Sequence, residues 1–394
     1  MTVLRLIFIF LILGGLQACG GGAKPRGALP GEDDLSAAAQ LGKAIFHDNS
    51  LSASGRMSCA SCHDPARGHA SPFDTPVAFG GANFPDDRSA SASGLRMSPA
   101  IRYLRYNSAF RIEADGTPRG GFFWDGRANS LAEQAQKPFL AANEMANLDA
   151  ADVVAKLART PYADRFRQLF GEGILADPTR ALERMGFALE RYQIEDREFA
   201  PFSSKFDAVN AGLARFTDAE SRGLEWFNRR DKGNCAACHP STKPDHAPAA
   251  LFTDFSYDSL GVPRNADIAA NRDPLFFDLG LCGPKRGDLN ALADLCGRFK
   301  VPSLRNVALR ARYFHNGRFD TLADVLRFYV TRDTQAQQWY PMAVYDDLPA
   351  AMRGNVNVSE GPYNRQRGQA AALSEAEMRD LLAFLNTLTD GYTP

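Results

Sequence analysis

The sequence contains little histidine, with six residues in 394, and it has no marked excess of charge of either sign. Lysine and arginine together number 45 and aspartate and glutamate 46, so the formal net charge is −1. Bulk electrostatics therefore gives no reason to expect nucleic acid as a partner. The sequence has no low-complexity block and no series of segments with the alternating pattern of β-strands. This combination predicts a mainly α-helical globular chain of two or three domains.

A hydrophobic stretch long enough to span a bilayer is also missing. A short basic segment and an apolar run at the N-terminus are too brief for that, and they predict a signal peptide at residues 1–18. The segment LQACG at residues 16–20 is similar to a bacterial lipobox, in which Cys19 would carry lipid. Simple cleavage after Ala18 is the alternative. Residues 19–34 are expected to be a flexible tether, so we expect a periplasmic protein that meets the membrane only through this lipid anchor.

Most of the cysteines fall in two copies of one motif. The segments CASCH at residues 59–63 and CAACH at residues 235–239 both have the form Cys-x-x-Cys-His, which attaches c-type haem. Two thiols at this spacing can form thioethers to one macrocycle, and the adjacent histidine becomes the proximal iron ligand. A zinc half-site or a redox dithiol is the alternative for a single copy. Two copies favour two covalently bound haem c groups, held by Cys59, Cys62, His63, Cys235, Cys238 and His239.

Two of the seven cysteines have no role in lipid or haem attachment. These are Cys282 and Cys296, which are close enough in sequence to close a short loop. An oxidising compartment allows such a pair to be oxidised. We therefore predict a disulfide between Cys282 and Cys296.

Helical patterns occur on both sides of an irregular stretch. Residues 64–121 are rich in Gly, Pro, Ser and Asp and lack periodicity, and we expect them to wrap over a haem. A helix precedes each haem motif, which indicates two cytochrome c-like domains in tandem. We place the domains at residues 35–205 and 206–394. Helical spacing or capping signals occur at residues 35–46, 130–136, 152–159, 161–170, 178–192, 217–228, 321–331 and 374–388.

Further motifs carry a resemblance to a known family. The segment FFWDGRA at residues 122–128, followed by Gln134 and Glu144, resembles the signature of bacterial di-haem cytochrome c peroxidases and the related MauG enzymes. The segments FKVPSLRNV at residues 299–307 and YFHNG at residues 313–317 resemble the second-domain signature of the same family. The resemblance covers about residues 35–392.

The resemblance implies a division of labour between the haems. The N-terminal haem would react with peroxide and the C-terminal haem would handle electrons, with Trp124 lying between them as an electron relay. Gln134 and Glu144 match the pair above the open iron, where a carboxylate can take a peroxide proton and return it to the leaving oxygen. Without these motifs, Trp124 would be interpreted more simply as a core aromatic, and Gln134 and Glu144 as residues on a solvated helix face.

The N-terminal haem is expected to have an open iron. Family members that need reductive activation close it with a histidine about sixteen residues past the first haem motif, and this chain has Phe79 there. Phenylalanine cannot ligate iron, so we predict a five-coordinate haem. The four histidines outside the motifs are expected to lie on the surface or to make hydrogen bonds; they are His47, His69, His246 and His315.

The C-terminal haem is expected to have a tyrosine ligand. Peroxidases of the family place a methionine fourteen residues after the histidine of the Tyr-Phe-His motif, and this chain has Tyr329 there. The arrangement resembles that of MauG, whose axial ligand is a tyrosine. A hard phenolate oxygen favours the higher oxidation states of iron. A tyrosine on the apolar face of a helix is the alternative.

Calcium is not expected, although the family often holds it between its domains. The family uses an Asn side chain in Arg-Asn-x-Pro, where this chain has Met97, and a thioether is a poor ligand for this cation. Arg310 and Arg312 add positive charge at the second calcium-binding segment. We predict that a guanidinium group takes the place of the ion.

Three functions fit these observations. The first is a peroxidase that reduces hydrogen peroxide with electrons from a small periplasmic redox protein. The second is a MauG-like enzyme that oxidises Trp or Tyr of a partner protein. The third is a di-haem electron carrier, which would need a strong ligand on each iron, and no residue is well placed to supply one to the first.

Overall fold

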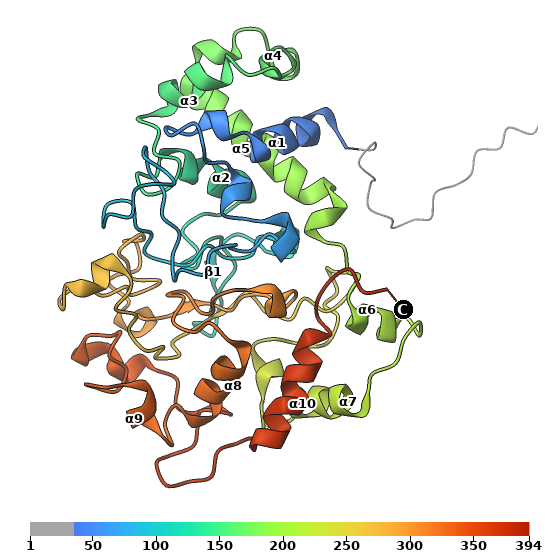
Figure 1. Cartoon of the computed structure of the whole chain (residues 1–394), viewed down its shortest axis with the longest axis vertical. Helices are drawn as coiled ribbons and strands as arrows, with labels where there is room; N and C mark the ends of the chain where they lie inside the picture. The colour runs from blue at the N-terminus through green and yellow to red at the C-terminus, as the bar shows by residue number, and fades with distance from the viewer. Residues whose placement is uncertain (1–34, 394) are drawn as a thin grey trace, which may run out of the picture.

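The computed structural model describes residues 35–393, and the predicted signal peptide, tether and Cys19 lie outside them. The chain forms two groups of helices that follow each other in sequence and lie one above the other in Figure 1. One apolar core runs through residues 41–199 and a second through residues 206–388. Within residues 35–393, no helix is both long enough and apolar enough to cross a bilayer.

The N-terminal group is organised around its longest helix. This helix, α5, packs against α1 and α2, and its first residue, Pro178, suits a helical N-terminus because its missing N–H would have no helical partner. Ser36 and Ser130 cap α1 and α2 by accepting backbone N–H bonds. The group consists of α1 (Ala37–His47), α2 (Leu131–Leu140), α3 (Ala150–Leu157), α4 (Ala163–Phe170) and α5 (Pro178–Glu195).

The C-terminal group is organised around two packed helices, α7 and α10. Both begin with a capping box, formed by Thr217 with Glu220 and by Ser374 with Glu377. The group consists of α6 (Lys205–Asn210), α7 (Asp218–Asn228), α8 (Leu322–Thr331), α9 (Ala336–Trp339) and α10 (Glu375–Asn386). The predicted helices therefore occur, within a few residues of the expected bounds.

Both groups use a glycine where two helices cross. A Cβ at Gly42 of α1 would lie 2.0 Å from the carbonyl oxygen of Ala188 in α5. A Cβ at Gly223 of α7 would lie 2.1 Å from the carbonyl oxygen of Asp380 in α10. In each group, the helix that leads to a haem motif thus approaches a later helix more closely than any larger residue allows.

Some elements differ from the expectation. No helix is expected between residues 192 and 217, but residues 205–210 form α6, which is capped by Ser204 and too short to show helical periodicity. Helix α4 begins at Ala163, so Pro161 precedes it and does not lie in its first turn. Residues 64–121 are irregular, as expected, apart from short pieces.

Short 3₁₀ helices are η2 (Asn49–Leu51), η3 (Cys59–Ser61), η4 (Pro65–Arg67), η5 (Leu104–Tyr106), η6 (Ile174–Ala176), η7 (Arg197–Phe199), η8 (Cys235–Ala237), η9 (Ala269–Arg272), η10 (Ala293–Leu295), η11 (Val307–Leu309) and η12 (Ala350–Asn355).

Strands are few and short, and they lie where the two groups meet. Strand β1 (Arg111–Ile112) pairs antiparallel with β2 (Pro118–Arg119), and β3 (Tyr257–Asp258) pairs antiparallel with β4 (Phe299–Lys300). Hydrogen bonds from the C-terminal group reach the segment after β2: the Tyr257 hydroxyl donates to the Gly120 carbonyl at 2.7 Å. The fold is therefore helix-rich, with its small sheets at the junction of the two groups.

Candidate haem cavities

The two Cys-x-x-Cys-His motifs have the same local structure. Each begins with a 3₁₀ turn, η3 or η8, that places both cysteines beside the following histidine. The His63 amide donates to the Cys59 carbonyl at 3.0 Å, and the His239 amide donates to the Cys235 carbonyl at 2.8 Å. The four motif cysteines are free of disulfides, and burial raises the pKa of each thiol to about 12.

Each motif opens into a large cavity. We call the cavity beside His63 the N-terminal cavity and the one beside His239 the C-terminal cavity. Their empty volumes, part of them open to solvent, are about 1320 Å³ and 1490 Å³. Each cavity is lined by both cysteines and the histidine of its own motif, so the space lies where a haem attached to that motif would sit.

The motif histidines are suited to ligate iron. The Nδ1 atom of His239 lies 2.8 Å from the Phe252 carbonyl, to which it donates, so Nε2 keeps its lone pair for a metal. Burial lowers the pKa of His63 to about 4, which keeps the ring neutral at physiological pH, as a ligand must be. Its enclosed Nδ1 has no hydrogen-bond partner among the described residues. The donor sets of both cavities therefore fit haem c.

The N-terminal cavity brings together the residues that the sequence assigned to peroxide chemistry. Phe79, Gln134 and Glu144 line the same cavity as Cys59, Cys62 and His63. Burial raises the pKa of Glu144, and the positive charges of Arg127 and Lys285 oppose this shift. A carboxyl group with a raised pKa is better suited to exchange a proton near neutral pH.

A glycine holds Phe79 in the wall of this cavity. A Cβ at Gly80 would lie 2.3 Å from the Asn143 carbonyl oxygen and 2.8 Å from the Cα of Glu144. The Gly81 amide also donates to the Glu144 carbonyl at 2.8 Å. The loop that carries Phe79 therefore packs directly on the backbone that carries Glu144.

The C-terminal cavity has a different wall. Tyr329, from α8, lines it together with Cys235, Cys238 and His239. A second tyrosine, Tyr363, lies 6.2 Å from Tyr329 between ring centroids, but its hydroxyl donates to Asp258 at 2.9 Å. Burial raises the pKa of Tyr329, so the chain alone favours the neutral phenol. A metal ion reverses this preference, because a cation stabilises the phenolate.

Trp124 lines both cavities. Its side chain is buried, and its indole Nε1 donates to the Met97 carbonyl at 2.7 Å. The Trp124 carbonyl accepts a bond from the Lys300 amide at 2.9 Å, which ties the residue to β4 of the other group. The residue therefore lies at the junction of the two groups, between the candidate haem positions.

The remaining histidines differ in their surroundings. His47 and His246 are exposed, and His69 is buried, where its Nδ1 accepts a bond from Arg102 at 3.2 Å. His315 lines the C-terminal cavity, where its ring stacks on Phe299 with 3.5 Å between centroids.

The residues at the family's calcium position make protein contacts instead. The Met97 side chain is buried, and its carbonyl accepts the Trp124 bond. The Arg310 Nη2 donates to the Ser303 carbonyl at 2.6 Å, and Arg312 donates to the Asp74 carbonyl. Arg310, unlike Arg312, lines the C-terminal cavity. That no calcium binds here stays a prediction.

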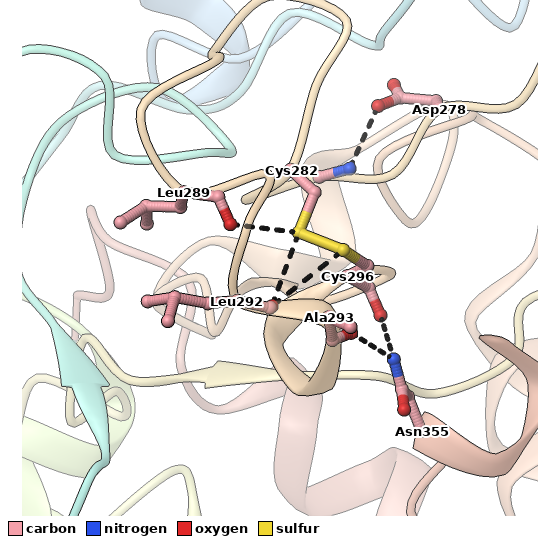
Figure 2. Close-up of a disulfide and its surroundings, with 8 residues drawn as sticks. Asp278, Cys282, Leu289, Leu292, Ala293, Cys296 and Asn355 are labelled. Atoms are coloured by element: carbon pink, nitrogen blue, oxygen red, sulfur yellow. Dashed lines mark hydrogen bonds between the residues drawn. A yellow bond between two sulfur atoms is a disulfide. The ribbon is translucent and has the colours of Figure 1, made fainter.

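Cys282 and Cys296 form a disulfide in the structure, shown in Figure 2. The bond closes a loop of the C-terminal group. The Asn355 side chain donates to the carbonyls of Ala293 and Cys296 at 2.7 and 3.1 Å and so holds one end of the loop. The same loop carries Lys285 to the wall of the N-terminal cavity.

Sequence reasoning did not single out several of these wall residues. Arg127 lies in the FFWDGRA segment, so its place in a motif could have identified it. Lys285 comes from the other group of helices, and its neighbours in sequence give no signal of a role in the N-terminal cavity. Arg96, Asp125 and Asp278 form ion pairs that only the folded chain brings together.

Comparison with known proteins decides the family. The family model described as di-haem cytochrome c peroxidase matches residues 36–215. The methylamine utilization protein MauG of Paracoccus denitrificans is 37% identical over 366 residues, which cover 92% of this chain and 90% of that protein. The chain belongs to the di-haem cytochrome c peroxidase and MauG family.

Other members of the family agree with this assignment. The cytochrome c peroxidase Ccp of Escherichia coli is 27% identical over 83% of this chain and 59% of its own length. The crystal structure of the diheme peroxidase BthA from Burkholderia thailandensis has a TM-score of 0.83 and 41% identity, and it covers 90% of this chain and 86% of that one. The predicted resemblance and the predicted class, a peroxidase-like oxidoreductase, are confirmed. Membership also implies haem c as the cofactor.

Proposed function

We propose that the chain is a di-haem c-type peroxidase that reduces hydrogen peroxide at the N-terminal cavity and shares the oxidising equivalents with the C-terminal cavity through Trp124. One observation carries the proposal: Glu144, Gln134 and a non-ligating Phe79 line the cavity of His63, whereas Tyr329 lines the cavity of His239. The wall of the N-terminal cavity thus suits an iron with a free coordination position. The wall of the C-terminal cavity suits an iron whose position is occupied by a side chain.

Haem held by Cys59, Cys62 and His63 would supply an iron that binds peroxide and accepts its oxygen. Glu144 would take the proton of the bound peroxide and return it to the leaving oxygen. Gln134 would hold the hydrogen bonds of the pocket. Phe79 would keep the distal side free of protein ligands.

The second haem would be held by Cys235, Cys238 and His239, and the phenol oxygen of Tyr329 would be available to its iron. In this arrangement, Trp124 would pass one electron toward the N-terminal cavity and take one from the C-terminal cavity. Two electrons would then enter from a small periplasmic redox protein. We also infer a location in the periplasm, with an anchor at Cys19, and domains at residues 35–205 and 206–394.

A second candidate function is the oxidative modification of Trp or Tyr in a partner protein. One observation favours it: Tyr329, which matches the tyrosine ligand of the MauG arrangement, lines the C-terminal cavity. Sequence identity does not separate the two candidates, because the chain is 37% identical to the MauG of Paracoccus denitrificans and 41% identical to the diheme peroxidase BthA. This candidate shares the peroxide chemistry of the first and differs only in the source of the electrons.

One experiment separates the two functions. Purified holoprotein is given hydrogen peroxide together with a reduced small cytochrome or cupredoxin, and turnover is followed by the absorbance of the donor. Continuous turnover that depends on peroxide supports the peroxidase. No donor oxidation, together with oxygen insertion or crosslinking detected by mass spectrometry in a co-purified partner protein, would support the second function and contradict the first.

A further inference from the structure

Four charged side chains form a continuous row beside Trp124. Arg127 Nη1 lies 2.9 Å from Asp125 Oδ1, and Arg96 Nη1 lies 2.7 Å from Asp125 Oδ2. Arg96 also donates to both carboxylate oxygens of Asp278, through Nε and Nη2, each at 2.7 Å. Positive and negative charges therefore alternate along the row, and their formal sum is zero.

The row connects the two cavities. Arg127 and Arg96 line the N-terminal cavity, and Asp278 lines the C-terminal cavity. Trp124, the neighbour of Asp125 in sequence, lines both. A row of ion pairs and an aromatic side chain thus run between the same two cavities.

Three of the four side chains of the row are buried and Arg127 is 20% exposed, so the charges of Arg96, Asp125 and Asp278 act most strongly. The Asp125 side chain has no exposed surface, and the side chains of Arg96 and Asp278 are 7% and 8% exposed. Burial alone would raise the pKa of Asp125, but the charges of Arg96 and Arg127 outweigh it and lower the pKa. At such depth a unit charge interacts with its neighbours several times more strongly than it would in water.

The hydrogen bond of Trp124 fixes the charge of its oxidised form. The indole N–H donates to the Met97 carbonyl at 2.7 Å. A peptide carbonyl can accept a hydrogen bond, but it is not basic enough to remove a proton. When Trp124 loses an electron, its Nε1 proton therefore stays in place and the indole becomes positively charged.

We propose that Asp278 is a positioning residue that holds and neutralises Arg96 beside Trp124, so that Trp124 can lose an electron within this row. The inference rests on the proposed function, in which peroxide oxidises the N-terminal cavity. One electron leaves Trp124 for that cavity, one electron returns to Trp124 from the C-terminal cavity, and no proton moves. Without the Asp278 charge, the row carries a net positive charge next to a side chain that must itself become positive.

The test compares the Asp278→Asn variant with the wild type in stopped-flow absorbance after mixing with hydrogen peroxide. The reaction at the N-terminal cavity depends on peroxide concentration, and the transfer between cavities does not. We expect the variant to keep the peroxide-dependent rate constant within about two-fold and to slow the peroxide-independent phase at least about ten-fold. The Asp278→Glu variant restores a carboxylate and is expected to recover most of that rate.

A double-mutant cycle shows whether Asp278 acts through Trp124. In a Trp124→Phe background, Asp278→Asn is expected to slow the transfer no further, because the side chain that it serves is gone. Equal slowing in both backgrounds would overturn the inference, since Asp278 would then act on the C-terminal haem directly. An unchanged peroxide-independent phase in the single variant would overturn it as well.

An equilibrium readout accompanies the kinetics. Spectroelectrochemistry is expected to show midpoint potentials of both haems in Asp278→Asn that differ from those of the wild type by less than about 59 mV, the one-electron equivalent of the expected ten-fold slowing. A larger shift of the C-terminal haem would contradict the inference, because Asp278 would then slow the transfer by acting on that haem directly.

A matched control is available in the same chain. Asp207 pairs with Arg305 through two bonds of 2.8 Å, Arg305 is fully buried, and the pair lines neither cavity. Asp207→Asn is expected to lower thermal stability and to leave the peroxide-independent phase unchanged.

A wild-type protein without any peroxide-dependent phase would contradict the proposed function itself, whereas an Asp278→Asn variant with both phases intact would contradict only the inference.

Discussion

The two cavities share a motif and differ in almost everything that faces it. Both present two cysteines and a histidine from a 3₁₀ turn. The N-terminal cavity adds Glu144, a carboxyl group with a raised pKa, whereas the C-terminal cavity adds Tyr329 beside a second tyrosine. The attachment motif is thus a local feature of five residues, whereas the side chains that face it come from far along the chain.

Among substitutions that make the two cavities more alike, the largest effect is expected from replacing the carboxyl group of the N-terminal cavity. Glu144→Gln keeps the size of the side chain and removes the proton acceptor, so the rate constant for the reaction with peroxide is expected to fall by about 10²–10⁴-fold. Stopped-flow absorbance at the first haem measures this constant. Glu133→Gln, on the surface of α2, is the matched control, and a loss of similar size there would contradict the role of Glu144.

The pH dependence of the same rate constant tests whether Glu144 is the proton acceptor. Glu144 must be ionised to accept a proton, and burial raises its pKa above that of an exposed glutamate, about 4.3. The rate constant is expected to fall as the pH falls through this raised pKa. A plot of the rate constant against pH should fall at low pH in the wild type and stay level in Glu144→Gln. A fall at low pH that persists in the variant would assign the titration to another group.

The next effect comes from closing the open iron. Phe79→His places a strong ligand where the structure has an apolar ring in the cavity wall. The first haem is expected to become low-spin and its reaction with peroxide to slow at least about ten-fold, because the imidazole would block the binding position. Electron paramagnetic resonance of the ferric protein reports the spin state. Two low-spin haems in the wild type would refute the open iron.

Removing the tyrosine tests the other cavity. Tyr329→Phe is expected to change the optical spectrum of the C-terminal haem and to leave the N-terminal haem unchanged, because the phenolate ligand is lost on one side only. Tyr340→Phe is the control: Tyr340 is a buried tyrosine of the same group that donates to the Gly261 carbonyl and lines neither cavity. An unchanged spectrum in Tyr329→Phe would remove the assignment of this ligand.

The smallest expected effects concern what the two groups have in common. Gly42→Ala and Gly223→Ala each force a methyl group against a backbone carbonyl at a helix crossing. Overpacking of this kind costs about 1–3 kcal/mol of stability. Urea unfolding, monitored at each haem separately, is expected to show the larger loss in the group that carries the substitution. A loss shared equally by both haems would indicate that the two groups unfold as one unit.

The sequence predicted those parts of the fold that depend on neighbouring residues. Capping at Thr217 and Ser374 and the apolar spacing of α5 depend on residues three or four positions apart, so the sequence contains the whole signal. Helix α6 was missed because six residues show less than two turns of periodicity. The family resemblance supplied Trp124, Gln134 and Glu144, which local patterns alone would have assigned to core or surface.

The contacts between the two groups could not be predicted in this way. Lys285 lies more than 140 residues after Glu144 in sequence, and Asp278 lies 182 residues after Arg96. No local pattern relates such distant positions, because a salt bridge requires only that two side chains meet once the chain has folded.

The disulfide has a consequence for how the protein matures. Under the proposed function, Cys282 would have to pair with Cys296 while the four cysteines of the haem motifs stay reduced until each reacts with a vinyl group. An early bond between Cys59 and Cys62 would block one cofactor, and a bond from either to the loop would also misplace Lys285. Oxidation of the loop and attachment of the two haems would then be competing reactions of one set of thiols. Productive assembly would require that the motif thiols stay reduced until haem arrives.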